Sequence, residues 1–225
     1  MNNKMGSWDN IWEKVFQENP WGKYPSESLI RFIATNFYKS NRSEIKILEV
    51  GCGTGANIWY ISREGFSAYG IDGSKTGIEI AKKRLDEENL HGNLVVGDII
   101  KLPYEDNFFD SVIDVECLYA NNFENTQLIL KEINRVLKND GLFYSRTLSD
   151  KMYIGKGFKQ YSKYEFDEVK LGPLKGKGYL RLIDRSGISS LYKKGFKIIS
   201  IDLMEYTQNN SKEFISEYII ITKKK

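Results

Sequence analysis

The chain has 225 residues, of which 41% are hydrophobic and 28% are charged, and its formal net charge is +3 at pH 7. These values are ordinary for a globular protein, and the length fits a single domain over residues 1–225. No run approaches ~20 apolar residues, which excludes a membrane span. Two cysteines without a pattern and one histidine argue against a zinc site, and they predict reduced thiols in a cytoplasmic protein.

The first predicted elements form a helical N-terminal arm over residues 1–40. Apolar residues at helical spacing from Trp8 to Phe16 indicate one face of a helix. A second helix is expected to begin at Pro25-Ser26, and the arm precedes the first strand.

Apolar runs and helical patterns then alternate along the chain, which predicts a parallel sheet with helices on both faces. The five expected strands are residues 46–50, a run ending at Asp72, and residues 94–96, 111–115 and 142–147. A lid insertion is expected at 149–178, then a helix at 181–194. An antiparallel hairpin is expected at 196–206 and 214–222. The predicted fold class is therefore α/β, with a doubly wound, seven-stranded, mostly parallel sheet.

A glycine-rich turn is the most informative segment of the chain. Between Ile47 and Gly55 an apolar run leads into an acid and then three glycines at alternate positions, which predicts a buried strand, a tight turn and a helix start. Glycine there permits unusual backbone angles and lets a ligand approach the main chain. Asp72 ends the next apolar run, where an acid can bind both hydroxyls of a ribose. We therefore expect a cofactor that contains a nucleoside.

Two cofactor classes fit this pattern. The residues from Gly51 to Ala56 also match the dinucleotide pattern, so an NAD-dependent oxidoreductase is one alternative. S-adenosylmethionine is favoured because Gly55 leaves space for a methionine tail, and because Glu49 would repel a pyrophosphate but attract an ammonium. Asp98, after the next apolar run, is well placed to meet an adenine amino group.

Five motifs occur in one order along the chain: the turn from Glu49 to Gly55, Asp72, Asp98, residues 109–114 and residues 135–141. They resemble the first motif, ribose acid, adenine-side acid, fourth strand and pre-fifth-strand helix end of class I S-adenosylmethionine-dependent methyltransferases of the small-molecule type. Asn-Asp replaces the usual Pro-Gly in the last motif. The resemblance covers roughly residues 45–148. The resemblance implies the fold of these methyltransferases, with S-adenosylmethionine as cofactor and S-adenosylhomocysteine as product. It does not imply a particular substrate.

The expected cofactor site combines the arm, the glycine turn and the strand ends. The Trp8-x-x-x-Trp12 spacing is similar to the arm of thiopurine-type methyltransferases, and the Trp21-Gly22-Lys23-Tyr24 turn is not a helix-packing pattern. The expected cofactor-binding residues are Trp12, Trp21, Tyr24, Glu49, Gly51, Cys52, Gly53, Gly55, Asp72, Gly73, Ser74, Asp98, Ile99, Asp114 and Val115.

The segment after the fourth strand should face the methyl group, because ligands bind outside the carboxyl ends of parallel strands. Glu116 and Tyr119 are the expected catalytic residues, with helix capping and packing as the alternative. The expected substrate-binding residues are Tyr119, Asn121, Arg146, Tyr153 and Lys156. Lysines and tyrosines in the lid favour methyl transfer to an O or N atom of a small anionic or sugar-like metabolite.

A methyltransferase acting on RNA or another macromolecule is the main alternative, because basic residues interleaved with aromatics can hold single-stranded RNA. Glu165, Asp167 and Glu168 interrupt the basic stripe, and the net charge is small, so a nucleic-acid partner is disfavoured. A binding protein without activity has no support, since every pocket acid and glycine is present. The sequence leaves the acceptor and the oligomeric state open.

Overall fold

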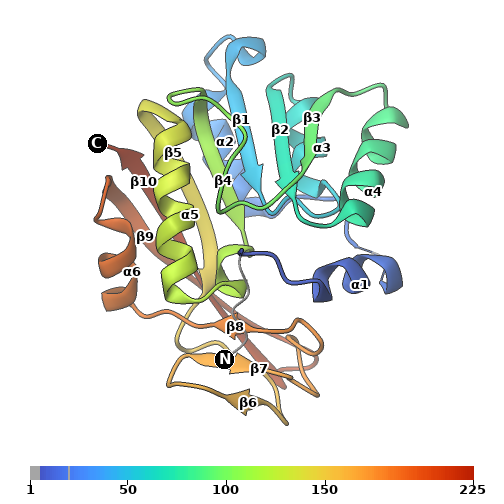
Figure 1. Ribbon diagram of the computed structural model, residues 1–225, viewed down its shortest axis with the longest axis vertical. Helices are drawn as coiled ribbons and strands as arrows, with labels where there is room; N and C mark the ends of the chain where they lie inside the picture. Colours follow the sequence, from blue (N-terminus) through green and yellow to red (C-terminus); the bar gives the residue numbers. More distant parts are fainter. Residues whose placement is uncertain (1–5, 20) are drawn as a thin grey trace.

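A seven-stranded sheet forms the centre of the computed structural model, which describes residues 6–19 and 21–225 (Figure 1). Met1 to Met5 and Pro20 of the predicted arm lie outside the described residues. The strands are β1 (Lys46–Val50), β2 (Ser67–Asp72), β3 (Gly92–Val96), β4 (Phe109–Val115), β5 (Leu137–Leu148), β9 (Phe196–Gln208) and β10 (Glu213–Lys224).

The strand order is β3-β2-β1-β4-β5-β10-β9. The neighbours from β3 to β5 pair in parallel, while β10 pairs antiparallel with both β5 and β9. This topology confirms the predicted doubly wound sheet and its terminal antiparallel hairpin. The order reverses between β1 and β4, and in such sheets a crevice forms there at the carboxyl ends of the strands.

Helices cover both faces of the sheet, each with an apolar stripe turned inward. α5 (Phe123–Val136) and α6 (Arg185–Tyr192) pack on one face. α2 (Glu27–Phe37), α3 (Ala56–Arg63) and α4 (Lys75–Asp86) pack on the other (Figure 1). Each fully buried aliphatic or aromatic side chain in these two layers contributes about 1.5–3 kcal/mol relative to an exposed one. The two layers hold β1 and β4 in place, and so position the crevice.

Capping side chains set where three of these helices begin. Ser74, Asn122 and Asp184 each accept a hydrogen bond from a backbone N–H three residues later, which satisfies one free donor of the first turn. The cap at Asp184 corrects the expected helix over 181–194. Helix α6 begins only at Arg185, and Leu180–Arg181 form a short strand instead.

Two further boundaries differ from expectation. Helix α1 (Ile11–Glu18) begins after Trp8, because the Asp9 carboxylate accepts the Ile11 N–H at 3.1 Å and starts the turn there. Trp8 and Trp12 therefore do not share one helical face. Strand β5 begins at Leu137 rather than at residue 142, since the backbone becomes extended directly after α5 and pairs with Phe109.

The chain between β5 and α6, residues 149–184, is here called the insertion. It contains a small antiparallel sheet of β6 (Lys159–Gln160), β7 (Glu165–Asp167) and β8 (Leu180–Arg181). Its apolar residues form a separate cluster with Tyr119 from the segment after β4 and with the start of β10. The insertion therefore lies beyond the carboxyl end of β5, beside the crevice (Figure 1).

In the described part of the chain, none of the helices has the length and apolar character that crossing a membrane requires.

Candidate active site

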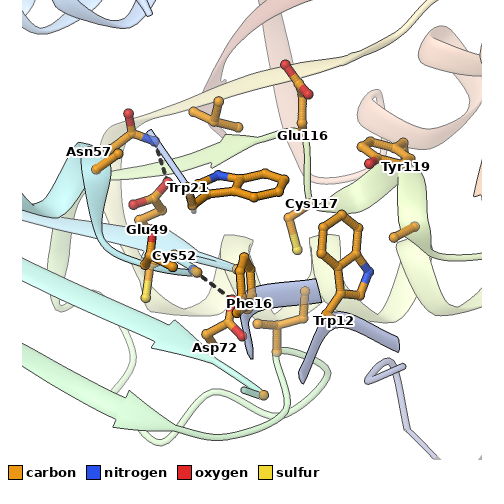
Figure 2. Close-up of a pocket in the computed structure, with 18 of the residues that line it drawn as sticks. Trp12, Phe16, Trp21, Glu49, Cys52, Asn57, Asp72, Glu116, Cys117 and Tyr119 are labelled. Atoms are coloured by element: carbon orange, nitrogen blue, oxygen red, sulfur yellow. Dashed lines mark hydrogen bonds between the residues drawn. The ribbon is translucent and has the colours of Figure 1, made fainter. Parts of the chain in front are cut away.

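A cavity of about 580 Å³ lies at the carboxyl ends of β1, β2 and β4 (Figure 2). Its walls come from the arm, the glycine turn, the segments that follow β2, β3 and β4, strand β5 and the insertion. The end of the cavity next to Glu49 and Asp72 is here called the cofactor end, and the end next to Glu116 and Tyr119 the acceptor end.

The glycine turn after β1 runs close to other groups in the cavity wall. Gly51 has a φ of +68°, and a Cβ there would lie 2.2 Å from the Cys117 Sγ. Gly53 has a φ of +48°, and a Cβ there would lie 2.9 Å from the Phe16 ring. Larger residues are therefore excluded at both positions by backbone angle and by space. Cys52 also lines the cavity and is buried.

Gly55 has a different role from the one expected. It is the N-cap of α3 and has a φ of +76°, and a Cβ there would lie 2.6 Å from the Cβ of Ala81 on α4. Gly55 is not part of the cavity wall; it allows the close approach of two helices behind the turn.

Asp72 ends β2 at the cofactor end. Its two carboxylate oxygens accept the backbone N–H groups of Gly53 and Ser74, each at 2.8 Å. Burial raises the pKa of this carboxyl, and these two hydrogen bonds oppose the rise. Gly73 lines the cavity beneath the Trp8 ring, whereas Ser74 caps α4 outside it.

Glu49 is the most buried acid of the cofactor end. Asn57 Nδ2 donates to Glu49 Oε1 at 2.5 Å, while Glu49 Oε2 accepts no hydrogen bond from any of the described residues (Figure 2). Burial raises the pKa of this carboxyl well above its ordinary value. A buried carboxylate oxygen without a donor is costly, so this atom fits a ligand that brings an ammonium. The methionine part of S-adenosylmethionine carries that group.

Asp98 follows β3 and contacts the arm. The backbone N–H of Ser7 donates to Asp98 Oδ2 at 2.8 Å, and the Ser7 hydroxyl donates to the other oxygen. Ile99 lines the cavity next to it and is buried. The acid expected beside an adenine therefore lies at the cavity wall, and Ser7 of the arm occupies both of its carboxylate oxygens.

The arm lines the cavity with five aromatic residues: Trp8, Trp12, Phe16, Trp21 and Tyr24. Phe16 and Trp21 meet edge to face with 5.6 Å between ring centroids, and Trp12 lies 6.3 Å from Trp21 (Figure 2). Glu13, on α1, accepts hydrogen bonds from the hydroxyls of Ser74 and Thr76, which holds α1 against the start of α4. Tyr24 also lines the cavity but is 77% exposed.

Asp114 shapes the acceptor end without lining it. It accepts the N–H groups of Cys117 and Leu118 at 2.9 and 3.1 Å and the Ser145 hydroxyl at 2.6 Å. Burial raises its pKa to about 6 despite these bonds. Asp114 thereby fixes the turn that follows β4. The predicted residues Val115, Glu116, Tyr119 and Asn121 of that turn, together with Arg146 from β5, do line the cavity.

The insertion reaches the cavity through residues other than the predicted ones. Tyr153 pairs through its backbone N–H with Phe214, and Lys156 is exposed, so the structure brings neither to the cavity. Lys177 lines it instead, with its Nζ 4.0 Å from the Trp21 ring centroid and 5.4 Å from that of Trp12. Burial lowers the pKa of Lys177 to about 8, while the indole faces favour the charged ammonium.

Sequence reasoning did not select Phe16, Asn57 or Lys177. Phe16 was assigned to a helix face, Asn57 has no motif, and Lys177 is one of seven lysines between residues 151 and 177. A signal for Asn57 exists, because a residue one turn into the helix after a glycine turn can reach back to the strand end. Across the described residues, no group of three or more His, Cys, Asp or Glu side chains is placed to hold a metal ion.

The comparisons with known proteins agree on the central part of the chain. Residues 48–145 match a family model described as a methyltransferase domain. The demethylmenaquinone methyltransferase of Tropheryma whipplei is 33% identical over 121 residues, which cover 53% of this chain and 48% of that protein. The chain spans about half the length of the first curated relatives it matches.

Two solved structures share the fold. An S-adenosylmethionine-dependent methyltransferase of Methanosarcina mazei gives a TM-score of 0.68 at 18% identity, over 89% of this chain and 98% of that one. Magnesium protoporphyrin IX methyltransferase of Synechocystis, with S-adenosylmethionine bound, gives 0.63 at 13% identity, over 96% and 80% of the two chains. The sequence match and the fold point the same way. Residues 48–145 are similar to the methyltransferase domain in sequence, and the chain shares its fold with solved S-adenosylmethionine-dependent methyltransferases.

Proposed function

We propose that this protein transfers the methyl group of S-adenosylmethionine to an O or N atom of a small molecule. The observation that carries the proposal is one cavity with two unlike ends. The cofactor end offers an unpartnered carboxylate oxygen at Glu49, and the acceptor end offers Glu116 and Tyr119 beyond the ends of the strands. The bound cofactor supplies a methyl group already activated by a sulfonium.

The roles at the cofactor end follow from its donors and acceptors. Glu49 binds the methionine ammonium, and Asp72 accepts ribose hydroxyls alongside the backbone donors that it already has. Asp98 binds the adenine part of the cofactor after its hydrogen bonds with Ser7 are broken. The glycine turn lets the cofactor lie against the main chain, because a Cβ at Gly51 or Gly53 has no space.

The arm and the insertion act as covers over this site. Trp12 and Trp21 come from the arm and Lys177 from the insertion, and they meet above the cavity. Methyl transfer depends mainly on alignment of the acceptor atom with the methyl group, in a space closed to water. We therefore assign the arm to the cofactor end and the insertion to the acceptor end, within one methyltransferase domain over residues 1–225.

The shape and charge of the acceptor end narrow the class of acceptor. Tyr119 at the acceptor end offers a flat apolar face, which suits a ring, and Trp12 and Trp21 of the arm add two more beside it. Lys177 and Arg146 are cations at the cavity, but Glu116 balances part of their charge. An acceptor that contains a ring is therefore supported, whereas an acceptor with a strong negative charge has less support. The similar protein from Tropheryma whipplei is named for demethylmenaquinone, which agrees with a small-molecule acceptor.

Two measurements test this function. Calorimetry should detect binding of S-adenosylmethionine and S-adenosylhomocysteine with similar affinity, and no binding of NAD. Incubation with methyl-labelled S-adenosylmethionine and a panel of small hydroxyl and amine compounds should then label at least one of them. Binding of NAD in preference to S-adenosylmethionine would refute the proposal. Cofactor binding without transfer to any compound or macromolecule would reduce it to a binding protein.

A macromolecular acceptor is the second candidate, and one exposed surface favours it. On the insertion, Phe158 and Tyr161 are 41% and 54% exposed, and Lys159 Nζ lies 4.9 Å from the Tyr161 ring centroid. Exposed aromatics with lysines suit stacked single-stranded bases. Label appearing in total RNA, and lost when Lys156, Lys159 and Lys163 are changed to Ala together, would favour this candidate over the first.

A further inference from the structure

A partly buried ionic cluster lies at the acceptor end of the cavity and extends behind it. Arg146, on β5, joins carboxylates from two other parts of the chain. Its Nη2 lies 3.3 Å from Glu116 Oε1 and 2.5 Å from Glu217 Oε2 on β10, and its Nε also donates to Glu217 at 3.1 Å. Glu116 and Arg146 line the cavity, while Glu217 does not. The guanidinium therefore connects a carboxyl group at the cavity to one hidden behind it.

The cluster contains two carboxyl groups but one guanidinium, and most of it is shielded from solvent. The side chains of Glu217, Arg146 and Glu116 are 3%, 12% and 37% exposed. Two carboxylates that share one cation, one of them almost fully buried, do not both ionise without cost, so the pair favours a proton on the more buried carboxyl, Glu217. Burial, the Glu116 carboxylate and a hydrogen bond to it raise the pKa of Glu217 to about 7, against the effect of Arg146.

Apart from Lys177, the other ionisable groups around the cluster do not cancel this excess charge. Tyr119 and, on β9, Tyr206 face the carboxyls; burial and the carboxylates raise the pKa of both phenols, which stay neutral. Asp114 is held by Ser145 and by the backbone after β4, and the Glu116 carboxylate adds to the rise in the pKa of Asp114. Lys177, from the insertion, is the second cation toward Glu116.

The backbone at Glu116 is held in an unusual conformation. Its φ is +59°, which a residue with a side chain rarely adopts, and its N–H donates to the Arg146 carbonyl at 2.9 Å. Such strain costs of order 1–3 kcal/mol and persists where the surroundings impose it, as they do at active sites. Figure 2 shows the Glu116 and Tyr119 side chains at a separate edge of the cavity from Glu49 and Cys52.

We propose that Glu116, Arg146 and Glu217 form a proton-accepting site, and that the acceptor is consequently a neutral O–H or N–H compound rather than an anion. This inference rests on the methyl transfer proposed above. As the acceptor atom bonds to the methyl carbon, the carbon–sulfur bond breaks and its electron pair stays on sulfur. The acceptor's proton passes to the Glu116 carboxylate, and solvent then removes it. Glu217 is a positioning residue that acts through Arg146.

The first test needs no acceptor. The full chain is labelled with ¹³C at the glutamate carboxyls, saturated with S-adenosylhomocysteine, and titrated by NMR. We expect a titration near pH 7 in the wild type that Glu116→Gln and Glu217→Gln each abolish. Glu213→Gln, on the same strand but outside the cluster, should leave it unchanged. If Glu116 and Glu217 both titrate near the ordinary value of ~4.3, no shared proton exists and the inference is wrong.

The second test measures transfer with matched probes: catechol against 3,4-dihydroxybenzoate, and aniline against 4-aminobenzoate. We expect the neutral member of each pair to be labelled faster, and the rate to rise with pH through about 7, because the base must lose its proton. Glu217→Gln should lower kcat about tenfold and remove this pH dependence, without changing the Kd of S-adenosylmethionine. Faster labelling of the carboxylated members would overturn the inference.

The two proposals can fail separately. If the wild type transfers methyl groups to no compound while the shared proton is present, the proposed function is at fault and the proton-holding cluster stands as described. If transfer occurs but Glu217→Gln keeps the wild-type pH profile, the function stands and the role of the cluster is refuted.

Discussion

The two ends of the cavity differ in how their charges are arranged. The cofactor end has three carboxylates, Glu49, Asp72 and Asp98, which accept hydrogen bonds from amides and a hydroxyl. The acceptor end opposes Glu116 and Glu217 with Arg146 and Lys177. The cofactor end is therefore suited to a cationic ligand rich in donors, whereas the acceptor end is nearly balanced and holds a proton that it can exchange.

The two ends also differ in the origin of their parts. Asp72 accepts the N–H groups of Ser74, two residues later, and of Gly53 in the turn after the neighbouring strand, so the strand ends themselves position this acid. Arg146 and Glu217 are 71 residues apart, and Lys177 comes from the insertion. Substitutions should consequently separate the two ends: some should weaken cofactor binding alone, and others should affect only the acceptor.

The largest effect should come from Gly53→Val, which acts on the cofactor end. A branched side chain is strained at a φ of +48° and would fill space beside Phe16, so S-adenosylmethionine affinity should fall more than ~100-fold, equivalent to about 2.7 kcal/mol. Calorimetry measures the loss, and thermal unfolding checks that the variant is folded. Gly65→Val is the control, since its φ of +86° brings the same backbone strain, while a Cβ there meets no described residue within 4 Å and Gly65 is outside the cavity wall. Wild-type affinity in the valine variant would contradict this account of the turn.

Glu49→Gln should have the next largest effect. It removes the charge that pairs with the methionine ammonium, which typically costs about 1.5–3 kcal/mol, or roughly 10- to 100-fold in Kd. Because burial raises the pKa of Glu49, wild-type affinity should strengthen as pH rises and this carboxyl ionises. The glutamine variant should lack that dependence in the same titration. Parallel pH curves for the two proteins would rule out Glu49 as the ammonium partner.

Removal of the arm should weaken the cofactor end by a smaller factor. Residues 1–24 carry Phe16, Trp21 and Glu13, but the helix α2 that completes one core layer begins later, at Glu27. The truncated protein should remain folded and bind S-adenosylmethionine about tenfold more weakly, as seen by circular dichroism and calorimetry. Glu13→Ala in the full chain, which loosens α1 from Ser74 and Thr76, should show part of this loss. Unchanged binding after truncation would leave the arm only a packing role.

The smallest effect should come from Lys177→Ala, which acts on the acceptor end. The variant loses contacts with two indole rings that are typically worth about 0.5–1 kcal/mol each, so KM for the acceptor should rise a few-fold. The Kd of S-adenosylmethionine should not change. Lys156→Ala, an exposed lysine of the same insertion, should leave both quantities unaltered. Equal effects of the two substitutions would show that the insertion acts by general charge rather than through the cavity.

The sequence was informative where one local pattern imposes one geometry. Glu49 and Asp72 end apolar strands, so their arrival at the carboxyl edge of the sheet could be predicted before any contact was known. The seven-stranded fold was predictable for the same reason. The ends of the elements were harder to predict. The first helix begins at Ile11 because the Asp9 carboxylate accepts the Ile11 N–H, and the spacing of apolar residues does not indicate that hydrogen bond.

The acceptor end depends on contacts between distant segments, which spacing along the chain does not encode. Glu217 lies in an apolar strand with no motif around it, and only the pairing of β10 with β5 brings it to Arg146. Lys177 differs from Lys156 only in the path of the insertion, which turns one toward the cavity and the other to solvent.

The arm has a practical consequence for studying this protein. Of its four tryptophans, Trp8, Trp12 and Trp21 line the cavity, and the fourth, Trp59, contacts Tyr24. Any ligand that enters must change the surroundings of several indoles at once. Intrinsic fluorescence is thus a built-in optical reporter of occupancy, and single Trp→Phe variants would assign its signal to one end of the site or the other, without an attached dye or a known acceptor.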